Sequence, residues 1–271
     1  MGFTQPDIEA LAERLRICRA EGRACAPLTQ THPDITLADA YKISSRNFVR
    51  RTAAGDVRSI GRKIGLTSLA VQKQLGVNQP DFGYLTSDMQ VANGGTVAAG
   101  SLIQGRAEGE VAFVLARDLR GPGITPSDVL AATDYVVACI EIIDSRVQDW
   151  KIQIQDTIAD NASSALLVLG DVRQHPGQFD LRMAGMTLWR NGEVESTGVG
   201  AACLDHPVNA VQWLANTLGE LGDTLKAGDI ILSGAYGPVA VLNPGDRVEV
   251  AISGLGRVSC RYADVTQKAE A

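Results

Sequence analysis

The stretch QGRAEGEVAFVL, residues 104–115, joins two closely spaced carboxylates to an uninterrupted apolar run. Side chains of a β-strand alternate between its two faces, so Glu108 and Glu110 project to the same side, about 7 Å apart along the strand. Gly109, which lies between them, leaves room for another group to approach closely. An apolar run of this length between turn signals is typical of a buried strand. The sequence therefore predicts a pair of acids at the start of a strand in the protein core.

A third acid in a similar setting is Glu141, within the apolar run VVACIEII of residues 136–143. An ionised carboxylate inside an apolar strand costs several kcal/mol unless it is paired or ligates a metal ion. If the two strands are neighbours, three carboxylates surround one hard divalent cation. Because the chain has only 3 histidines and no clustered cysteines, oxygen ligation favours Mg²⁺, Mn²⁺ or Ca²⁺ over Zn²⁺.

Two other interpretations of these acids stay open on the sequence alone. The closely spaced pair also suits the solvent-facing side of an edge strand, because most acidic side chains are exposed. Glu141 also suits a salt bridge to Arg106, Arg146 or Lys63, which would neutralise it without any metal ion.

The composition places limits on the class of protein. The 271 residues are 45% hydrophobic and 21% charged, enough for one large domain or two small ones. The net charge of -6 does not favour nucleic acid as a partner. The 5 cysteines form no CxxC pair, which favours buried thiols in a reducing compartment and hence a cytoplasmic protein. No apolar run approaches the roughly 18 residues of a membrane span, and the charged N-terminal segment resembles no export signal.

Periodicity and turn signals predict an α+β fold. Apolar residues at helical spacing predict helices over residues 6–22, 37–52 and 206–221, and Thr125 is a plausible cap for a further short helix. Short apolar strands are predicted over residues 62–66, 108–115, 136–143, 165–169, 186–189, 230–232, 247–252 and 257–262. We expect a helical N-terminal region, residues 1–58, packed on one mixed, mostly antiparallel β core, residues 59–271.

Seven blocks of the sequence carry a family resemblance. They are GRKIGLT (61–67), QLGVNQPDFGYL (74–85), RAEGEVAFVL (106–115), IEIIDSR (140–146), DTIADNASS (156–164), LDHPVNAVQWLANTL (204–218) and LSGAYGPVAVLNPGD (232–246). In this order they resemble the 2-keto-4-pentenoate hydratase (2-hydroxypenta-2,4-dienoate hydratase) family of the fumarylacetoacetate hydrolase superfamily. The resemblance covers the chain from about residue 5 to residue 262 and is far more specific than the paired acids alone.

The resemblance implies a mixed β-roll or sandwich core, a Mg²⁺ or Mn²⁺ site and a place in the meta-cleavage degradation of aromatic compounds. It implies metal ligands at Glu108, Glu110 and Glu141, the three acids identified above. It also implies that Lys63 and Asp81 lie at the active site. A homo-oligomer is expected on the same ground, as is a complex with a pathway decarboxylase or aldolase.

Three further residues are candidate substrate contacts. Ser163 is implied by the resemblance, and Asn161 beside it offers a second neutral hydrogen-bonding group, although the segment also suits a plain turn. Gly234 would let the backbone approach a ligand closely, although a tight turn between strands explains it equally well.

Substrates of this family are 2-hydroxy-2,4-dienoates, whose C1 carboxylate and C2 oxygen chelate one metal ion. Our hypothesis is that protonation at C5 ketonises the dienol and that water then adds at C4 to give a 4-hydroxy-2-oxo acid. Asp81 is the candidate general acid/base, because partial burial between Pro80 and Phe82 would raise its pKa toward neutral pH. Lys63 is a candidate partner of the substrate carboxylate or of the enol proton. A turn aspartate and a solvated basic pair are the alternatives for these two residues.

Two other reactions also fit a site of three carboxylates. One is decarboxylation of a 2-oxo-3-enedioate such as 4-oxalocrotonate, and the other is hydrolysis of a carbon–carbon bond in an acylpyruvate. The SGAYGP block resembles the hydratase form of its loop, so we expect the hydratase. An inactive subunit that stabilises a decarboxylase is disfavoured, because all the candidate site residues are present. The sequence predicts neither the physiological dienoate, nor the number of subunits, nor the choice between Mg²⁺ and Mn²⁺.

Overall fold

The computed structural model describes residues 3–264, and its first part is helical. The helices are α1 (Gln5–Glu21), α2 (Leu28–Thr31) and α3 (Leu37–Thr52). The backbone N–H of Thr4 donates to Asp7 Oδ2 at 2.9 Å at the start of α1, and Gly22 ends this helix with a φ of 64°. The side chain of Thr36 caps α3 by accepting the backbone N–H of Asp39. The two long N-terminal helices predicted from the sequence are therefore confirmed.

The larger sheet contains 8 strands in the order β2-β1-β10-β5-β6-β7-β3, with β11 paired to β5. Its strands are β1 (Ser59–Gly65), β2 (Asp81–Thr86), β3 (Gln90–Val91), β5 (Arg106–Leu115), β6 (Thr133–Ile143), β7 (Ser164–Leu169), β10 (Ile230–Leu232) and β11 (Ala240–Val241). β1 runs parallel to β10 and β3 to β7, whereas the other pairs are antiparallel. β5, which carries the two paired acids, therefore lies inside the sheet between β10 and β6.

The smaller sheet has 5 strands in the order β4-β13-β12-β8-β9. They are β4 (Thr96–Val97), β8 (Gly185–Arg190), β9 (Glu193–Val199), β12 (Arg247–Ile252) and β13 (Gly256–Tyr262). The sheet packs on β5 so closely that a Cβ at Gly109 would lie 3.0 Å from Met186 Sδ and 3.1 Å from a methyl carbon of Val250. Gly109 thus admits the second sheet, on the face opposite to the two acids.

Four further helices connect the strands, with short 3-10 helices beside them. The α-helices are α4 (Leu69–Leu75), α5 (Pro126–Ala132), α6 (Ile154–Ala159) and α7 (Pro207–Glu220). The 3-10 helices are η1 (Ser87–Met89), η2 (Gln148–Trp150), η3 (Asn161–Ser163), η4 (Pro176–Gln178) and η5 (Gly200–Ala202). Thr125 caps α5 as predicted, and His206 Nδ1 caps α7 by accepting the N–H of Val208 at 3.1 Å. The sequence patterns missed α2, α4, α6 and five strands, namely β2, β3, β4, β9 and β11.

One face of the larger sheet combines a charged end with an apolar end. Directly opposite residues of neighbouring strands share a face, so Lys63, Leu232, Ala112 and Val137 form one row across β1, β10, β5 and β6. Beyond this row toward the start of β5, the same face carries the acids of β5 and β6. Leu232, Ala112 and Val137 of this row belong to an apolar cluster that also contains Leu85, Met89, Cys139 and Leu167. The fold therefore places charged groups beside a closed apolar core.

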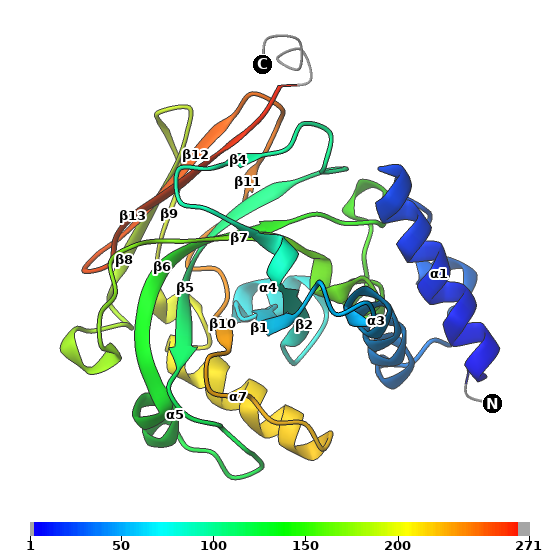
Figure 1. The fold of residues 1–271 in the computed structure, drawn as a ribbon, viewed down its shortest axis with the longest axis horizontal. Helices are drawn as coiled ribbons and strands as arrows, with labels where there is room; N and C mark the ends of the chain where they lie inside the picture. Colours follow the sequence, from blue (N-terminus) through cyan, green and yellow to red (C-terminus); the bar gives the residue numbers. More distant parts are fainter. Residues whose placement is uncertain (1–2, 265–271) are drawn as a thin grey trace.

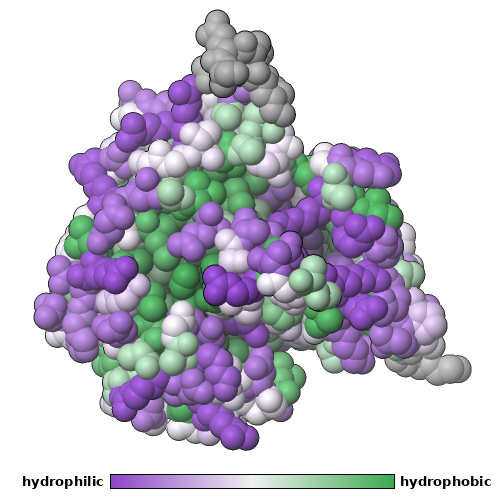
Figure 2. Space-filling view, viewed as in Figure 1, coloured by the Kyte–Doolittle hydropathy of each residue, from purple (hydrophilic) through white to green (hydrophobic). Residues whose placement is uncertain are grey.

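The helical region packs against the β core on one side of the molecule (Figure 1). Its apolar cluster includes Ile158 and Ala159 of α6, so α1 to α3 are anchored by a helix from the middle of the chain. β1 begins at Ser59, beside the predicted boundary, and the division into residues 1–58 and 59–271 stays a prediction. On the face shown in Figure 2, hydrophobic residues gather over the strands, with hydrophilic residues around them.

The structure also describes the cysteines and the apolar character of the helices. All five cysteines are free thiols, and four of them are buried, with Cys25 half-buried. In the described part of the chain, none of the helices combines the length and the apolar character that crossing a membrane requires.

Candidate active site and metal centre

The three predicted acids meet on one face of the larger sheet. In the antiparallel pairing of β5 and β6, Glu108 lies directly opposite Glu141, and Glu110 lies opposite Cys139 two residues further along. One carboxylate oxygen from each glutamate lies within 4.8 Å of the other two. Glu110 and Glu141 are both 0% exposed. Because these acids are buried in the middle of a sheet, the interpretation as an exposed edge strand is wrong.

The nearest counter-charge is Lys63 from β1, which is buried on the same face. Its Nζ lies 3.2 Å from Glu141 Oε2 and donates to the carbonyl oxygen of Ala162 at 3.0 Å. Burial by itself lowers the pKa of Lys63, but the surrounding carboxylates, Glu141 first among them, raise it overall. The surrounding carboxylates therefore favour the charged form of Lys63, and the predicted salt bridge to Glu141 is present together with the carboxylate cluster.

One ammonium group does not balance three carboxylates, of which two are fully buried and Glu108 is half-buried. Burial raises the pKa of Glu108 to about 7, against the opposing effect of Lys63. Burial also raises the pKa of Glu110 well above its ordinary value, and the carboxylates of Glu141 and Glu108 raise it further. The protein alone thus favours protonation of part of the cluster, whereas a divalent cation among the oxygens would favour full ionisation.

Hydrogen bonds orient two of these carboxylates and leave one oxygen of each available. The Ser164 hydroxyl donates to Glu141 Oε1 at 2.8 Å, and the backbone N–H of Gly234 donates to Glu110 Oε2 at 2.8 Å. Glu110 Oε1 and Glu141 Oε2 are buried and accept no hydrogen bond. Three carboxylates with available oxygens suit Mg²⁺ or Mn²⁺, and three protein ligands leave coordination positions for a substrate. The residues therefore fit the predicted metal ion.

Asp81 is the first residue of β2 and lies opposite Gly65 of β1. It is 1% exposed, so the alternative of a turn aspartate is wrong. Burial raises the pKa of Asp81 to about 6, although Lys63 opposes this effect. A Cβ at position 65 would lie 2.2 Å from Asp81 Oδ1, so only glycine leaves room for this carboxylate. Asp81 can thus hold or release a proton near neutral pH, as a general acid/base requires.

The segment between α6 and β7 carries the other predicted polar contacts. Asn161, Ala162 and Ser163 have φ values of 59°, 50° and 55°, a left-handed conformation that L residues adopt at a cost. This conformation directs the Ala162 carbonyl at Lys63, and it places the Ser163 hydroxyl 3.3 Å from Thr157 Oγ1. Ser163 is therefore located where a substrate contact is expected, on a backbone that tertiary contacts hold in shape.

Asn161 and Gly234 are used differently from the prediction. Both polar ends of the Asn161 side chain bind the backbone of Tyr84, since Oδ1 accepts its N–H at 2.7 Å and Nδ2 donates to its carbonyl at 3.0 Å. Gly234 has a φ of 105°, and a Cβ there would lie 2.1 Å from Thr67 Oγ1. Asn161 thus holds β2 in place, and the N–H of Gly234 holds Glu110. Both residues position the site in this structure, and a direct contact of either with substrate stays a prediction.

A cavity of about 740 Å³ opens beside the cluster. Lys63, Asp81, Glu108 and Ser163 line its polar end. The rest of its wall is largely apolar and includes Ile64, Leu66, Ile143, Ile152, Val199, Ala202, Pro238 and Val239. An apolar cavity with a few convergent polar groups is the usual form of a small-molecule site.

Several residues of the site were not predicted. Arg106 lines the cavity and stacks on Trp150, with its guanidinium carbon 4.2 Å from the ring centroid. Tyr236 also lines it, and its buried hydroxyl has no hydrogen-bond partner. Ser164 orients Glu141 and Thr157 contacts Ser163, as described above. The DTIADNASS and LSGAYGP blocks contain three of these residues, but only the tertiary contacts show which ones face the site.

Comparisons with known proteins agree with this geometry. The family whose pattern matches residues 56–262 is described as fumarylacetoacetate (FAA) hydrolase C-terminal. The chain is 48% identical over 259 residues to 2-hydroxyhexa-2,4-dienoate hydratase of Comamonas testosteroni, covering 95% of this chain and 98% of that protein. It is 48% identical over 260 residues to 2-keto-4-pentenoate hydratase of Paraburkholderia xenovorans (strain LB400), covering 96% of each.

Solved structures extend the comparison to the fold. The 4-oxalocrotonate decarboxylase from Pseudomonas putida G7, complexed with magnesium and adipate, has a TM-score of 0.92 at 37% identity and covers 96% of this chain and 98% of its own. The fumarylpyruvate hydrolase from Pseudomonas aeruginosa, in complex with Mn²⁺ and pyruvate, has a TM-score of 0.61 at 18% identity and covers 76% of this chain and 90% of its own. The second likeness concerns the fold alone. The chain belongs to the fumarylacetoacetate hydrolase superfamily and, within it, to the 2-keto-4-pentenoate hydratase family.

Proposed function

We propose that this chain is a Mg²⁺- or Mn²⁺-dependent hydratase of meta-cleavage aromatic degradation. It adds water to 2-hydroxypenta-2,4-dienoate or a close analogue and forms a 4-hydroxy-2-oxo acid. The observation that carries the proposal is the buried cluster of Glu108, Glu110 and Glu141, which opens into a cavity beside Lys63 and Asp81. The hydratase names of relatives that are 48% identical along almost the whole chain support it.

The three glutamates would hold the metal ion. When bound, Mg²⁺ or Mn²⁺ supplies Lewis acidity toward the oxygens of a 2-oxo acid or of its enol. Lys63 has three N–H donors, of which one donates to the Ala162 carbonyl, and its ammonium group also forms an ion pair with Glu141. A remaining donor is available to a substrate oxygen, so Lys63 orients the acidic end of the substrate.

Asp81 carries the proton transfers in this proposal. As a carboxylate it accepts the proton of the substrate 2-hydroxyl, and as an acid it delivers that proton to C5, which converts the dienol into an α,β-unsaturated ketone. In the second stage Asp81 accepts a proton from the water whose oxygen bonds to C4, and it then delivers that proton to C3 as the enolate returns to the ketone. A pKa of about 6 suits both directions, because each protonation state is populated near neutral pH.

Decarboxylation of 4-oxalocrotonate is the second candidate, and one observation favours it. Arg106 lines the cavity as a second cation beside Lys63, which suits a substrate with two carboxylates. The decarboxylase from Pseudomonas putida G7 is, however, only 37% identical to this chain, against 48% for the hydratases. An acylpyruvate hydrolase is less well supported, because the fumarylpyruvate hydrolase from Pseudomonas aeruginosa is only 18% identical to this chain.

Three proposals concern the setting of the enzyme. We propose a homo-oligomer, for which exposed apolar side chains such as Leu69 and Met183, 64% and 59% exposed, offer contact area. We propose a complex with a pathway decarboxylase or aldolase, on family resemblance. The free thiols support a cytoplasmic location.

A comparison of two substrates tests the function. The purified protein is incubated with freshly generated 2-hydroxypenta-2,4-dienoate and, separately, with 4-oxalocrotonate, with Mg²⁺ or with EDTA, and the products are identified by mass. We expect a Mg²⁺-dependent gain of one water from the dienoate and no loss of CO₂ from the enedioate. Loss of CO₂ without hydration would make the protein a decarboxylase and overturn the proposal.

A further inference from the structure

A second cavity lies between the helical region and the β core, away from the carboxylate cluster. It has a volume of about 480 Å³ and is lined by residues of α1, α3, β2 and the end of α6. The turn after α6 separates the two cavities, since Asp160 and Asn161 line this one whereas Ala162 and Ser163 line the active site. The proposed reaction uses none of the side chains that project into it.

The wall of this cavity carries an excess of positive charge. Its lining contains five arginines, namely Arg16, Arg19, Arg50, Arg51 and Arg146, but only two acids, namely Asp88 and Asp160. Arg51 binds Asp88 and Arg146 binds Asp160, so each acid already has a partner. Arg50 and Arg16 bind glutamates of α1. The pairs account for every one of these arginines except Arg19.

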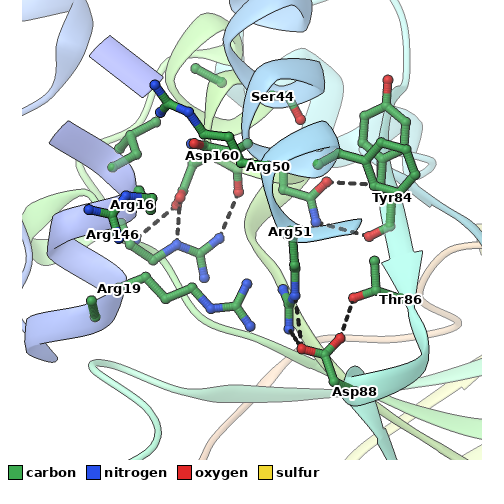
Figure 3. A pocket seen from close by; sticks show the side chains of 16 residues that line it. Arg16, Arg19, Ser44, Arg50, Arg51, Tyr84, Thr86, Asp88, Arg146 and Asp160 are labelled. Carbon is green, nitrogen blue, oxygen red and sulfur yellow. Dashed lines mark hydrogen bonds and ion pairs between the residues drawn. The ribbon is translucent and has the colours of Figure 1, made fainter. Parts of the chain in front are cut away.

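Arg19 forms no ion pair with any residue in the described range 3–264. Figure 3 shows its guanidinium directed at the space that the guanidinium groups of Arg51 and Arg146 also approach, from three different parts of the chain. The Arg19 side chain is exposed overall; partial desolvation of its guanidinium, together with the positive charges of Arg51 and Arg146, lowers its pKa. A guanidinium kept among like charges is stabilised by an anion placed between them.

A second, independent feature of the same wall is an unused hydrogen-bonding group. Ser44 of α3 is 2% exposed, lines the cavity, and its hydroxyl has no hydrogen-bond partner. A hydroxyl can donate to an anion, and a buried hydroxyl without a partner is uncommon in folded proteins. Leu15, Phe48 and Ala159 form the apolar part of the wall, so the cavity has room for a carbon skeleton as well as a charged group.

We propose that this cavity binds a small organic anion, a carboxylate or a phosphate monoester, whose charged oxygens lie between Arg19, Arg51 and Arg146. The Ser44 hydroxyl lies at the end of the cavity away from these guanidinium groups (Figure 3), where it can donate to a second polar group of the ligand, and the carbon skeleton between them packs on the apolar wall. A volume of about 480 Å³ falls within the usual range for such ligands. The site is distinct from the hydratase site and does not depend on the proposed reaction.

The test measures binding of succinate and of glycerol 3-phosphate to the metal-free protein by calorimetry, at constant ionic strength. We expect saturable binding of at least one of them, one molecule per chain. Arg19→Gln should weaken this binding by about tenfold or more, because a charge-assisted hydrogen bond is lost. The matched control is Arg16→Gln, which changes an arginine of the same wall whose charge is already paired with Glu13, and its affinity should stay within a few-fold of wild type.

Other outcomes separate this site from the active site and from misfolding. Metal-dependent turnover checks that Arg19→Gln is folded, because Arg19 contacts no residue of the carboxylate cluster. If that variant does not fold, Ser44→Ala, which changes no charge, should still weaken binding measurably. The proposal is overturned if wild type binds neither probe at millimolar concentrations, or if Arg19→Gln binds as tightly as wild type, since the probe would then occupy another site.

Discussion

Ser164→Ala tests how the site orients Glu141. The Ser164 hydroxyl donates to Glu141 Oε1 at 2.8 Å, and both residues are 0% exposed. The substitution leaves this oxygen without a donor in the protein interior, where a hydrogen bond to a charged group contributes about 1.5–3 kcal/mol. Because about 1.4 kcal/mol corresponds to a factor of ten in a binding constant, we expect the metal dissociation constant to rise roughly 10- to 100-fold.

The assay is a titration of metal-free protein with Mn²⁺, followed by electron paramagnetic resonance, together with the dependence of turnover on metal concentration. The kcat at saturating metal should stay within a few-fold of wild type, because Ser164 orients a ligand and does not contact substrate in our account. Ser163→Ala is the matched control, since this neighbouring hydroxyl contacts Thr157 Oγ1 and not Glu141. The control should keep its metal affinity and raise KM. Wild-type metal affinity in Ser164→Ala, or an equal loss in the control, would refute the reasoning.

Three other substitutions probe separate parts of the site. Glu110→Gln should abolish Mn²⁺ binding and turnover, because a metal ligand is lost. The Tm of the metal-free protein should stay level or rise, because burial holds the pKa of Glu110 well above its ordinary value and the neutral amide removes an unfavourable buried charge. A large drop in Tm in a calorimetric scan would count against this. Asp81→Asn should lower kcat by about 10²- to 10⁴-fold. In the wild type, kcat/KM should fall as the pH decreases through about 6, where Asp81 becomes protonated. If kcat/KM of Asp81→Asn still falls over the same pH range, another group is responsible for the decrease. Gly65→Ala should lower kcat and spare Mn²⁺ binding, because the new Cβ would lie 2.2 Å from Asp81 Oδ1; unchanged kinetics would show that Asp81 has room to move.

Sequence patterns identified the acids of the carboxylate cluster, but not that all three meet. Strand alternation puts Glu108 and Glu110 on one face, and the cost of burying Glu141 alone requires a cation near it. The direct pairing of Glu108 with Glu141 depends on the register of β5 against β6, which apolar patterning leaves open. The family resemblance assigned all three acids to one metal site, which local sequence patterns alone do not do.

The environment of Asp81 was harder to predict because it is made by contacts between distant segments. QPDFG has the composition of a turn, yet β2 begins at Asp81 because β1 pairs with it and Gly65 leaves room for the carboxylate. Gly83 weakens the strand signal, but a Cβ there would lie 2.3 Å from the Asn161 carbonyl oxygen. The close packing of this segment on β2 also explains Asn161, whose side chain binds the backbone of Tyr84 in β2.

The central claim is that hydration takes place at a metal ion held by Glu108, Glu110 and Glu141. The most direct measurement adds Mn²⁺ in steps to metal-stripped protein with 2-hydroxypenta-2,4-dienoate, and records bound Mn²⁺ and product mass in the same samples. We expect one Mn²⁺ per chain and a product heavier by one water that forms in proportion to the bound ion. Hydration at full rate in the stripped protein, or turnover that does not follow occupancy, would contradict the account.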